Sequence, residues 1–177
     1  MMLSKQKQQT AFEALSESQG YKNRMRAPRI EKIVVSSGTG KAKDKKRNEL
    51  VAEKLALITG QKASPRPAKV SIAQFKMREG DIIGFQVTLR GSRMFDFLDK
   101  LIHIALPRTR DFRGISEGAV EEMGNITIGI NEDTIFPETS DEDLKDVFGL
   151  AITIVTTAKS KEEALAFFRH LGIPFKK

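Results

Sequence analysis

The chain contains no cysteine. Disulfide bonds, zinc sites built on cysteine, iron–sulfur clusters and catalysis by a thiol are therefore excluded. Histidine is nearly as scarce, because His103 and His170 are the only two, and this excludes a metal site rich in histidine. No stretch approaches 18 uninterrupted apolar residues, and the first residues lack the apolar run of a secretory signal. We therefore expect a soluble intracellular protein with no membrane partner.

The composition and the charge indicate a folded domain with an anionic partner. Hydrophobic residues make up 40% of the 177 residues, enough to bury a core, and we expect a single domain over residues 1–177. The net charge of +7 favours nucleic acid, a membrane surface or an acidic protein as the partner. Residues 1–80 hold 18 basic and 7 acidic residues, whereas residues 115–146 hold ten acidic residues and one lysine. This division fits either two differently charged partners or ordinary surface variation.

Apolar periodicity and the positions of glycine and proline predict the helices and strands. Helices are expected at residues 4–19, 44–59, 92–106 and 160–170, and strands at residues 30–36, 83–90, 126–130 and 150–157. Pro107 is expected to end the third helix, a capping box that starts at Ser160 to open the fourth, and a helical turn to form around residues 141–147. The pattern predicts an α+β fold, with a mostly antiparallel sheet, helices packed on one face and the other face free.

The strand at residues 83–90 carries different chemistry on its two faces. Apolar and hydrogen-bonding side chains alternate along it, so one face should pack on the helices. The apolar side chains are Ile83, Phe85, Val87 and Leu89, and the polar ones are Gln86, Thr88 and Arg90. The free face of the sheet is thus expected to offer groups that suit RNA riboses and base edges.

The Gly-Thr-Gly-Lys sequence at residues 38–41 lies between a predicted strand and a predicted helix, where a phosphate-binding loop would lie. A Walker-type loop needs a further glycine and a hydroxyl residue at the positions that are here Val35 and Ala42. The sequence therefore favours a tight turn, and a small nucleotide-dependent enzyme remains an alternative. Structural roles are expected for His103 and His170, because neither has a second ligand at metal spacing.

Basic side chains in connectors and loops can reach phosphates, with an affinity that weakens as salt rises. They are Arg24, Arg26, Arg29, Lys62, Arg66, Lys69, Lys76 and Arg78. Phe75 and Phe112 lie beside basic residues and are candidates for base stacking, although a loop aromatic tucked into the core is as good an interpretation. Two interpretations of these basic residues remain open: specific binding of RNA, and nonspecific binding of any polyanion or membrane surface.

Short motifs along nearly the whole chain match one family. They lie at residues 27–33, 38–40, 58–62, 75–80, 87–94, 107–114, 124–125, 135–138 and 156–160, and the chain ends in Phe-Lys-Lys. The run Pro-Arg-Thr-Arg-Asp-Phe-Arg-Gly at residues 107–114 is the most specific. The chain resembles the bacterial form of the large-subunit ribosomal protein that binds 5S ribosomal RNA, the fifth in the large-subunit series. The resemblance implies a non-enzymatic, cytoplasmic, ribosome-bound protein of the central protuberance, without catalytic residues, metal or cofactor, in contact with large-subunit rRNA.

The resemblance also implies a site for 5S rRNA. The family uses an Asn at the end of the first strand, a Gln after the second helix, and a Thr and an Arg on the long strand. The corresponding residues here are Ser36, Gln61, Thr88 and Arg90, with Lys62 beside Gln61. Ser36 departs from the family, because it keeps one hydroxyl and loses the paired donor and acceptor of an amide.

Two further contacts are implied by the resemblance. The loop at residues 71–80, expected to be mobile, would reach the P-site tRNA with Ser71, Gln74, Phe75, Lys76, Met77 and Arg78, of which Lys76 and Arg78 would contact phosphates. The family also forms an intersubunit bridge with a basic protein of the small-subunit head. Its acidic charge makes the segment at residues 115–146 our candidate for that bridge. Residues 1–20 are expected to be an N-terminal helix of the same domain.

Overall fold

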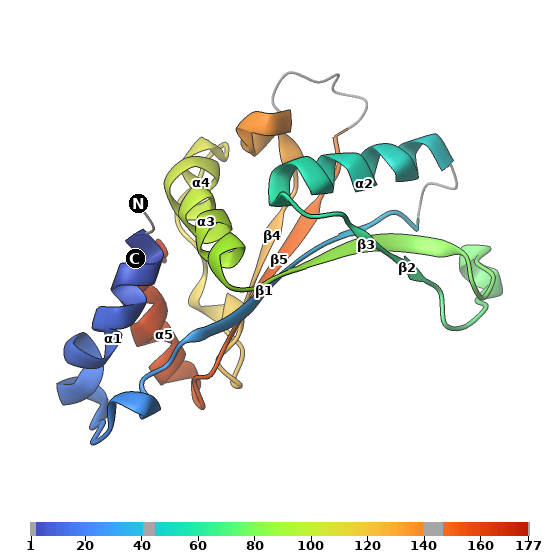
Figure 1. Cartoon of the computed structure of the whole chain (residues 1–177). Helices are drawn as coiled ribbons and strands as arrows, with labels where there is room; N and C mark the ends of the chain where they lie inside the picture. The colour runs from blue at the N-terminus through green and yellow to red at the C-terminus, as the bar shows by residue number, and fades with distance from the viewer. Residues whose placement is uncertain (1–2, 41–44, 140–146, 177) are drawn as a thin grey trace. The chain divides into compact units, whose positions relative to one another are not determined.

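The computed structural model describes residues 3–40, 45–139 and 147–176. In this part of the chain one sheet contains β1 (Ile30–Gly38), β2 (Ser64–Pro67), β3 (Ile82–Leu89), β4 (Ile126–Ile130) and β5 (Leu150–Thr156). The strand order is β2-β3-β1-β5-β4 and the sheet is antiparallel (Figure 1). The predicted α+β class is confirmed, and so are the four predicted strands.

Strand β2 was not among the four predicted strands. It pairs antiparallel with β3 from Ser64↔Gln86 to Pro67↔Ile82, with an irregularity between Arg66 and Pro67. Proline cannot donate to a strand ladder, so a strand with two prolines is suited only to the edge of a sheet. That is the place β2 has in the strand order.

The helices are α1 (Leu3–Gln19), α2 (Lys45–Thr59), α3 (Ser92–Lys100), α4 (Leu106–Arg108) and α5 (Lys161–Leu171). Short 3-10 turns occur at Arg24–Arg26, Ala73–Phe75, Glu117–Ala119, Asp133–Ile135 and Pro137–Thr139. The predicted helices at residues 4–19, 44–59 and 160–170 are confirmed to within about a residue at each end. Most of the turn predicted around residues 141–147 lies outside the described residues.

The prediction that Pro107 ends the third helix is wrong. After α3 the chain forms a π turn, Leu101–Ala105, in which the Leu106 amide donates to the Leu101 carbonyl. A new helical segment, α4, then carries the chain through Pro107 to Arg108. Proline is tolerated in the first turn of a helical segment, where its missing N–H is not needed. Pro107 therefore lies within the helical run and does not end it.

The chain forms two compact units. The terminal unit comprises Met1–Ile33, Leu89–Ile128 and Thr153–Lys177, and the central unit comprises Val34–Thr88 and Gly129–Ile152. Helices α1, α3, α4 and α5 belong to the terminal unit, and α2 and β2 to the central unit. The expectation of a single domain stays a prediction.

In the terminal unit, α1 packs against α5 and α3. Ala11 and Leu15 of α1 are buried, as are Phe167 and Phe168 of α5. The Lys7 ammonium donates to the Leu171 carbonyl at 3.0 Å, which joins α1 to the end of α5. Of the apolar face expected at Ala11, Phe12, Ala14 and Leu15, the structure buries Ala11 and Leu15, leaves Phe12 half-buried and exposes Ala14.

The start of α5 confirms the predicted capping box with one change. The Ser160 hydroxyl accepts a hydrogen bond from the Glu163 amide at 3.3 Å. The Glu163 carboxylate accepts in return from the amide of Lys159, at 2.8 Å, one residue before the cap. Two amides near the helix start, which have no partner within the helix, are thereby bonded.

In the central unit, α2 buries Val51, Leu55 and Ile58, while β1 and β3 bury Val35 and Val87. The three buried residues of α2 recur at helical spacing, as expected for the side of a helix that faces a core.

The same unit contains a buried ion pair. The Lys54 ammonium lies 3.6 Å from the Asp133 carboxylate, and the two side chains are 3% and 0% exposed. The other Asp133 oxygen accepts from the Phe148 amide at 3.1 Å, and the Lys54 ammonium lies 5.7 Å from the centre of the Phe148 ring. Asp133 therefore joins α2 to the chain that leads into β5.

Candidate nucleic-acid interface

The exposed side of β3 has the chemistry that the sequence predicted. Val87 and Leu89 are buried, whereas Gln86 and Thr88 are half-buried and Arg90, directly after the strand, is exposed. Buried and exposed positions alternate because successive side chains of a strand point to opposite faces. The predicted alternation is confirmed from Phe85 to Arg90, whereas Ile83 is half-buried, and the outer face of β3 carries amide and hydroxyl groups.

The structure brings Gln61 and Thr88 together. The Gln61 amide nitrogen donates to the Thr88 carbonyl oxygen at 3.3 Å. The end of α2 fixes this position, because the Thr59 hydroxyl bonds the carbonyls of Leu55 and Gln61 at 2.6 Å and 3.2 Å. Gly60 makes the turn with a φ of +67°, in the left-handed region that favours glycine. Lys62 follows and is exposed.

Ser36 lies on β1, the neighbour of β3, and is half-buried, whereas Ser37 is buried and donates to the Gly149 carbonyl at 2.7 Å. The burial pattern therefore places Ser36 on the outer face and Ser37 on the core face. β1 and β3 approach closely at Gly84, where a Cβ would lie 2.7 Å from the Ser37 carbonyl oxygen. Only glycine fits there without displacing the backbone.

Arg90 is a residue of the terminal unit, and the four other predicted 5S rRNA residues belong to the central unit. Within the central unit the structure brings together Gln61 and Thr88 directly, and places Ser36 on the strand next to that of Thr88.

The segment predicted as a loop at residues 71–80 is folded on itself. Ile72 and Met77 exchange two backbone hydrogen bonds, of 3.1 Å and 3.2 Å. Lys76 closes the turn with a φ of +51°, a left-handed conformation that is uncommon for a residue other than glycine. The Ser71 hydroxyl accepts from the Glu79 amide at 2.9 Å. These bonds give the loop a defined tip.

The tip presents most of the predicted tRNA-contacting side chains to solvent. Met77 is half-buried, and the exposed side chains are Ser71, Gln74, Phe75, Lys76 and Arg78. Phe75 is 61% exposed, whereas Phe112, the other stacking candidate, is half-buried. The structure thus favours Phe75 as the aromatic residue available for stacking.

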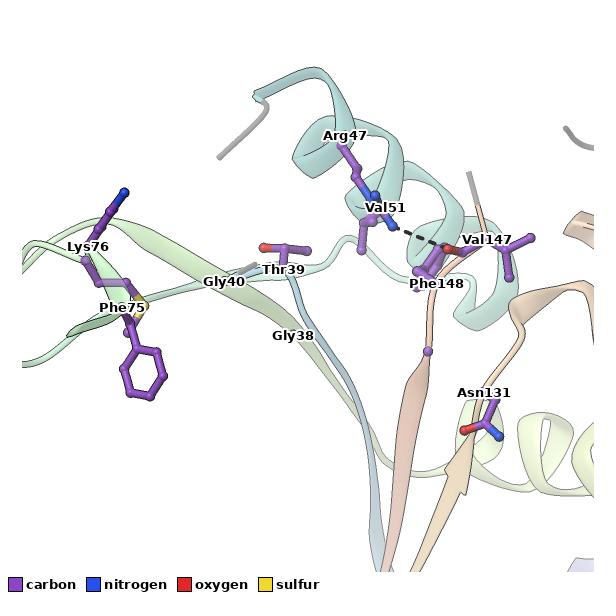
Figure 2. Close-up of a pocket in the computed structure, with 12 residues that line it drawn as sticks. Gly38, Thr39, Gly40, Arg47, Val51, Phe75, Lys76, Asn131, Val147 and Phe148 are labelled. Atoms are coloured by element: carbon purple, nitrogen blue, oxygen red, sulfur yellow. Dashed lines mark hydrogen bonds between the residues drawn. The ribbon is translucent and has the colours of Figure 1, made fainter. Parts of the chain in front are cut away.

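A hollow of the central unit lies between this tip, the start of α2 and the start of β5. Its wall includes Gly38, Thr39 and Gly40, and Figure 2 shows Phe75 and Arg47 at different places on its lining. A phosphate-binding loop directs its amides at the ligand. The Thr39 amide instead donates to the Ile83 carbonyl at 2.9 Å. The structure therefore favours a tight turn, and residues 41 and 42 lie outside the described part of the chain.

The two histidines have different surroundings. His103 is exposed on the π turn, and His170, near the end of α5, contacts the Lys7 carbonyl at 2.8 Å and the Thr10 hydroxyl at 3.2 Å. Within the described ranges, His, Asp and Glu form no group of three that could hold a metal ion. The same part of the chain has no helix long and apolar enough to span a bilayer.

The acidic segment at residues 115–146 is not one uniform surface. Glu117 pairs with Arg169, and Asp133 is committed to the buried pair with Lys54. The remaining described carboxylates are exposed: Glu121 and Glu122 in the terminal unit, and Glu132 and Glu138 in the central unit. The other four acidic residues of the segment lie outside the described residues. Sequence counting treated all ten alike because burial cannot be read from charge.

Two family models and several known proteins are similar to this chain over most of its length. Residues 23–78 match the family model described as ribosomal protein L5, and residues 82–175 match the model that describes the C-terminus of the same ribosomal family. A large ribosomal subunit protein uL5 of Anaeromyxobacter sp. (strain K) is 51% identical over 158 residues, which cover 89% of this chain and 88% of the relative. The uL5 protein of Rubrobacter xylanophilus is 51% identical over 164 residues, covering 92% and 91%.

The α+β fold, the basic loops and these similarities define the chain as a ribosomal protein of the large subunit. It belongs to the ribosomal protein L5 family. It is therefore a structural, rRNA-binding protein of the translation machinery and not an enzyme, and it is bound to ribosomes in the bacterial cytoplasm. The nucleotide-dependent enzyme considered for residues 38–41 is set aside on this ground.

Proposed function

We propose that the chain binds 5S rRNA through the outer face of β1 and β3 and attaches it to the central protuberance of the large subunit. The observation that carries this proposal is the hydrogen bond from the Gln61 amide to the Thr88 backbone carbonyl, which holds the Gln61 side chain at β3, where Thr88 is half-buried. Ser36 adds a second hydroxyl on the neighbouring strand. Neutral donors and acceptors held by a sheet suit riboses and base edges, and Lys62 and Arg90 supply charge for phosphates.

The folded tip at residues 71–80 is proposed to contact the P-site tRNA. Its support is the exposure of Phe75, Lys76 and Arg78 on a turn that backbone hydrogen bonds hold. A cation beside an exposed ring can bind a phosphate and stack on a neighbouring base. Other basic loop residues would contact large-subunit rRNA through phosphates.

The exposed carboxylates of the acidic segment are proposed to face a basic protein of the small-subunit head, forming an intersubunit bridge. Glu121 and Glu122 support this proposal in the terminal unit, and Glu132 and Glu138 in the central unit. Asp133 is excluded from the bridge because it is buried. Charge of opposite sign would steer the two subunits together and weaken with salt.

The test compares Arg90→Ala with Lys76→Ala. Arg90→Ala should weaken binding to a 5S rRNA transcript by about 1–3 kcal/mol, because charge-assisted hydrogen bonds are lost. Lys76→Ala should leave 5S affinity nearly unchanged and weaken only the contact with tRNA. Affinities are measured for 5S rRNA and for an unrelated RNA of equal length across a salt series. Equal affinity of the unaltered protein for both RNAs at every salt concentration would reject specific 5S binding.

A further inference from the structure

The tip at residues 71–80 leaves the sheet at an irregularity in the pairing of β2 with β3. Arg66 pairs with Gly84 and Pro67 pairs with Ile82, so Ile83 has no partner on β2. One extra residue in a strand is a β-bulge, which bends the strand and increases its twist. The direction in which the two strands continue to the tip is therefore set at Ile83 and Gly84.

Strand β1 ends at the same place. It runs to Gly38, and the Thr39 amide then donates to the Ile83 carbonyl at 2.9 Å. Beyond the bulge the pairing resumes, because the Ala68 amide donates to the Asp81 carbonyl at 2.8 Å. Figure 1 shows the two paired segments running on to the tip past the end of β1. The tip is thus carried by a pair of segments that bends where the support from β1 stops.

Gly84 lets β1 and β3 approach each other at this bend. A Cβ at position 84 would lie 2.7 Å from the Ser37 carbonyl oxygen, so any side chain there must displace one of the two strands. β1 is the harder strand to displace, because it lies between β3 and β5 and the Ser37 hydroxyl donates to the Gly149 carbonyl at 2.7 Å. A side chain at position 84 would therefore shift the start of β3, and with it the tip.

Side-chain packing adds little to the support of the tip. The Met77 sulfur lies 3.7 Å from the point where a Cβ of Gly40 would be, so Met77 packs near the end of β1. Met77 is half-buried, whereas the other residues from 71 to 80 are exposed. Backbone pairing at the bulge therefore decides where the tip points.

We infer that Gly84 is a positioning residue for the tip, which fixes the direction in which Phe75, Lys76 and Arg78 face the tRNA. This inference rests on the proposed tRNA contact and adds that the contact depends on a residue with no RNA-binding group. Gly84 is buried and has no side chain, so its substitution removes no donor or cation. Hydrogen bonds weaken steeply with distance and angle, so a tip that points elsewhere loses its contacts.

The first experiment measures the direction of the tip without RNA. The chain has no cysteine, so spin labels can be attached to Gln74→Cys at the tip and to Glu53→Cys on α2, two exposed positions of the central unit. Gly84→Ala should shift the distribution of distances between the labels. Gly129→Ala is the matched control on β4 of the same unit, because its Cβ would meet nothing within 4 Å, and it should leave the distribution unchanged. An unchanged distribution in Gly84→Ala would overturn the inference.

A second variant removes the bulge without a clash. An alanine inserted between Arg66 and Pro67 gives β2 a partner for Ile83, and β2 is an exposed edge strand. This insertion should also shift the distance distribution, and it decides the matter if Gly84→Ala does not fold. The distribution of the unaltered chain, found again in the insertion variant, would show that the bulge does not direct the tip.

The second experiment measures the affinity of P-site tRNA for ribosomes assembled with each chain. Gly84→Ala should weaken tRNA binding about as much as Lys76→Ala does. The affinity of the purified Gly84→Ala chain for a 5S rRNA transcript should stay within about twofold of the unaltered value, because β1 keeps its place. Equal losses of tRNA and 5S binding would overturn the inference, since they would indicate general damage to the unit.

The comparison with Lys76→Ala separates this inference from the proposed function. A loss of tRNA binding in Lys76→Ala without a loss in Gly84→Ala would overturn the positioning role and keep the tRNA contact. No loss in Lys76→Ala would reject the contact itself, and the distance measurement would then decide alone whether Gly84 directs the tip.

Discussion

The central unit and the terminal unit expose polar chemistry in two different ways. On β1 and β3 the half-exposed groups are hydroxyls and amides, and the sheet fixes their spacing. On the connector between α1 and β1, at residues 22–29, the exposed groups include four cations, two of them on the 3-10 turn Arg24–Arg26. Neutral hydrogen-bonding groups discriminate between RNAs because each donor must meet an acceptor, whereas cations attract any phosphate. In our proposals, the outer face of β1 and β3 therefore supplies specificity, and the exposed basic residues supply affinity.

A face that discriminates between RNAs must be held rigidly by the central unit. The largest expected effect therefore comes from breaking the buried pair of Lys54 and Asp133 in this unit. Lys54→Met should lower the free energy of unfolding by about 3–5 kcal/mol, because it leaves the Asp133 carboxylate buried without its cation. Urea unfolding measures the loss. Lys54→Met with Asp133→Asn is the control, and it should recover most of the stability because no buried charge remains. A loss below about 1 kcal/mol in the single variant would mean that the pair is not needed for the fold of this unit.

This buried pair is a feature that could not be predicted from the sequence. Helices and strands followed from periodicity, and the outer face of β3 followed from the alternation at Gln86 and Thr88. Nothing in the sequence distinguishes Lys54 from the other lysines of α2, and its partner is 79 positions away, so no local pattern could indicate burial. Pro107 was misjudged because a new helical segment begins at Leu106 after the π turn, which puts the proline in a first turn where it is tolerated.

Some features of the candidate site could be predicted from the sequence and others could not. The outward direction of Thr88 could be derived from alternation, because a strand has a period of two. The contact between Gln61 and Thr88 could not, since it depends on how the turn at Gly60 leaves α2. The roles of Ser36 and Gln61 came only from the family resemblance. The connector was seen as basic, but its anchoring by Tyr21 and Thr157 is visible only in the structure.

Ser36→Asn should increase the preference of the outer face of β1 and β3 for 5S rRNA. The substitution supplies a paired donor and acceptor on the outer face of β1, where the family carries Asn. We expect about tenfold tighter binding to 5S rRNA, equal to about 1.4 kcal/mol, with no change for an unrelated RNA and no change in salt slope. Ser37→Asn is not a usable control because that side chain is buried, so Thr127→Asn, on the exposed side of β4, takes its place. A gain for both RNAs would show that position 36 does not contribute to specificity.

The smallest expected effect concerns the anchor of the connector. Burial, assisted by the hydrogen bond to Glu163 and its charge, raises the pKa of Tyr21 above its ordinary value. The folded protein therefore keeps this hydroxyl protonated at a pH where the unfolded chain ionises it, near 10. The stabilising contribution is complete below about pH 10 and declines as the pH rises above it. Tyr21→Phe should accordingly cost about 1 kcal/mol at pH 8, from the lost hydrogen bond, and the deficit should shrink by pH 10.5.

Urea unfolding of both proteins at pH 8, 9, 10 and 10.5 measures that deficit. A constant deficit over this range would contradict the raised pKa, because it would mean that the hydroxyl ionises equally in the folded and unfolded chains.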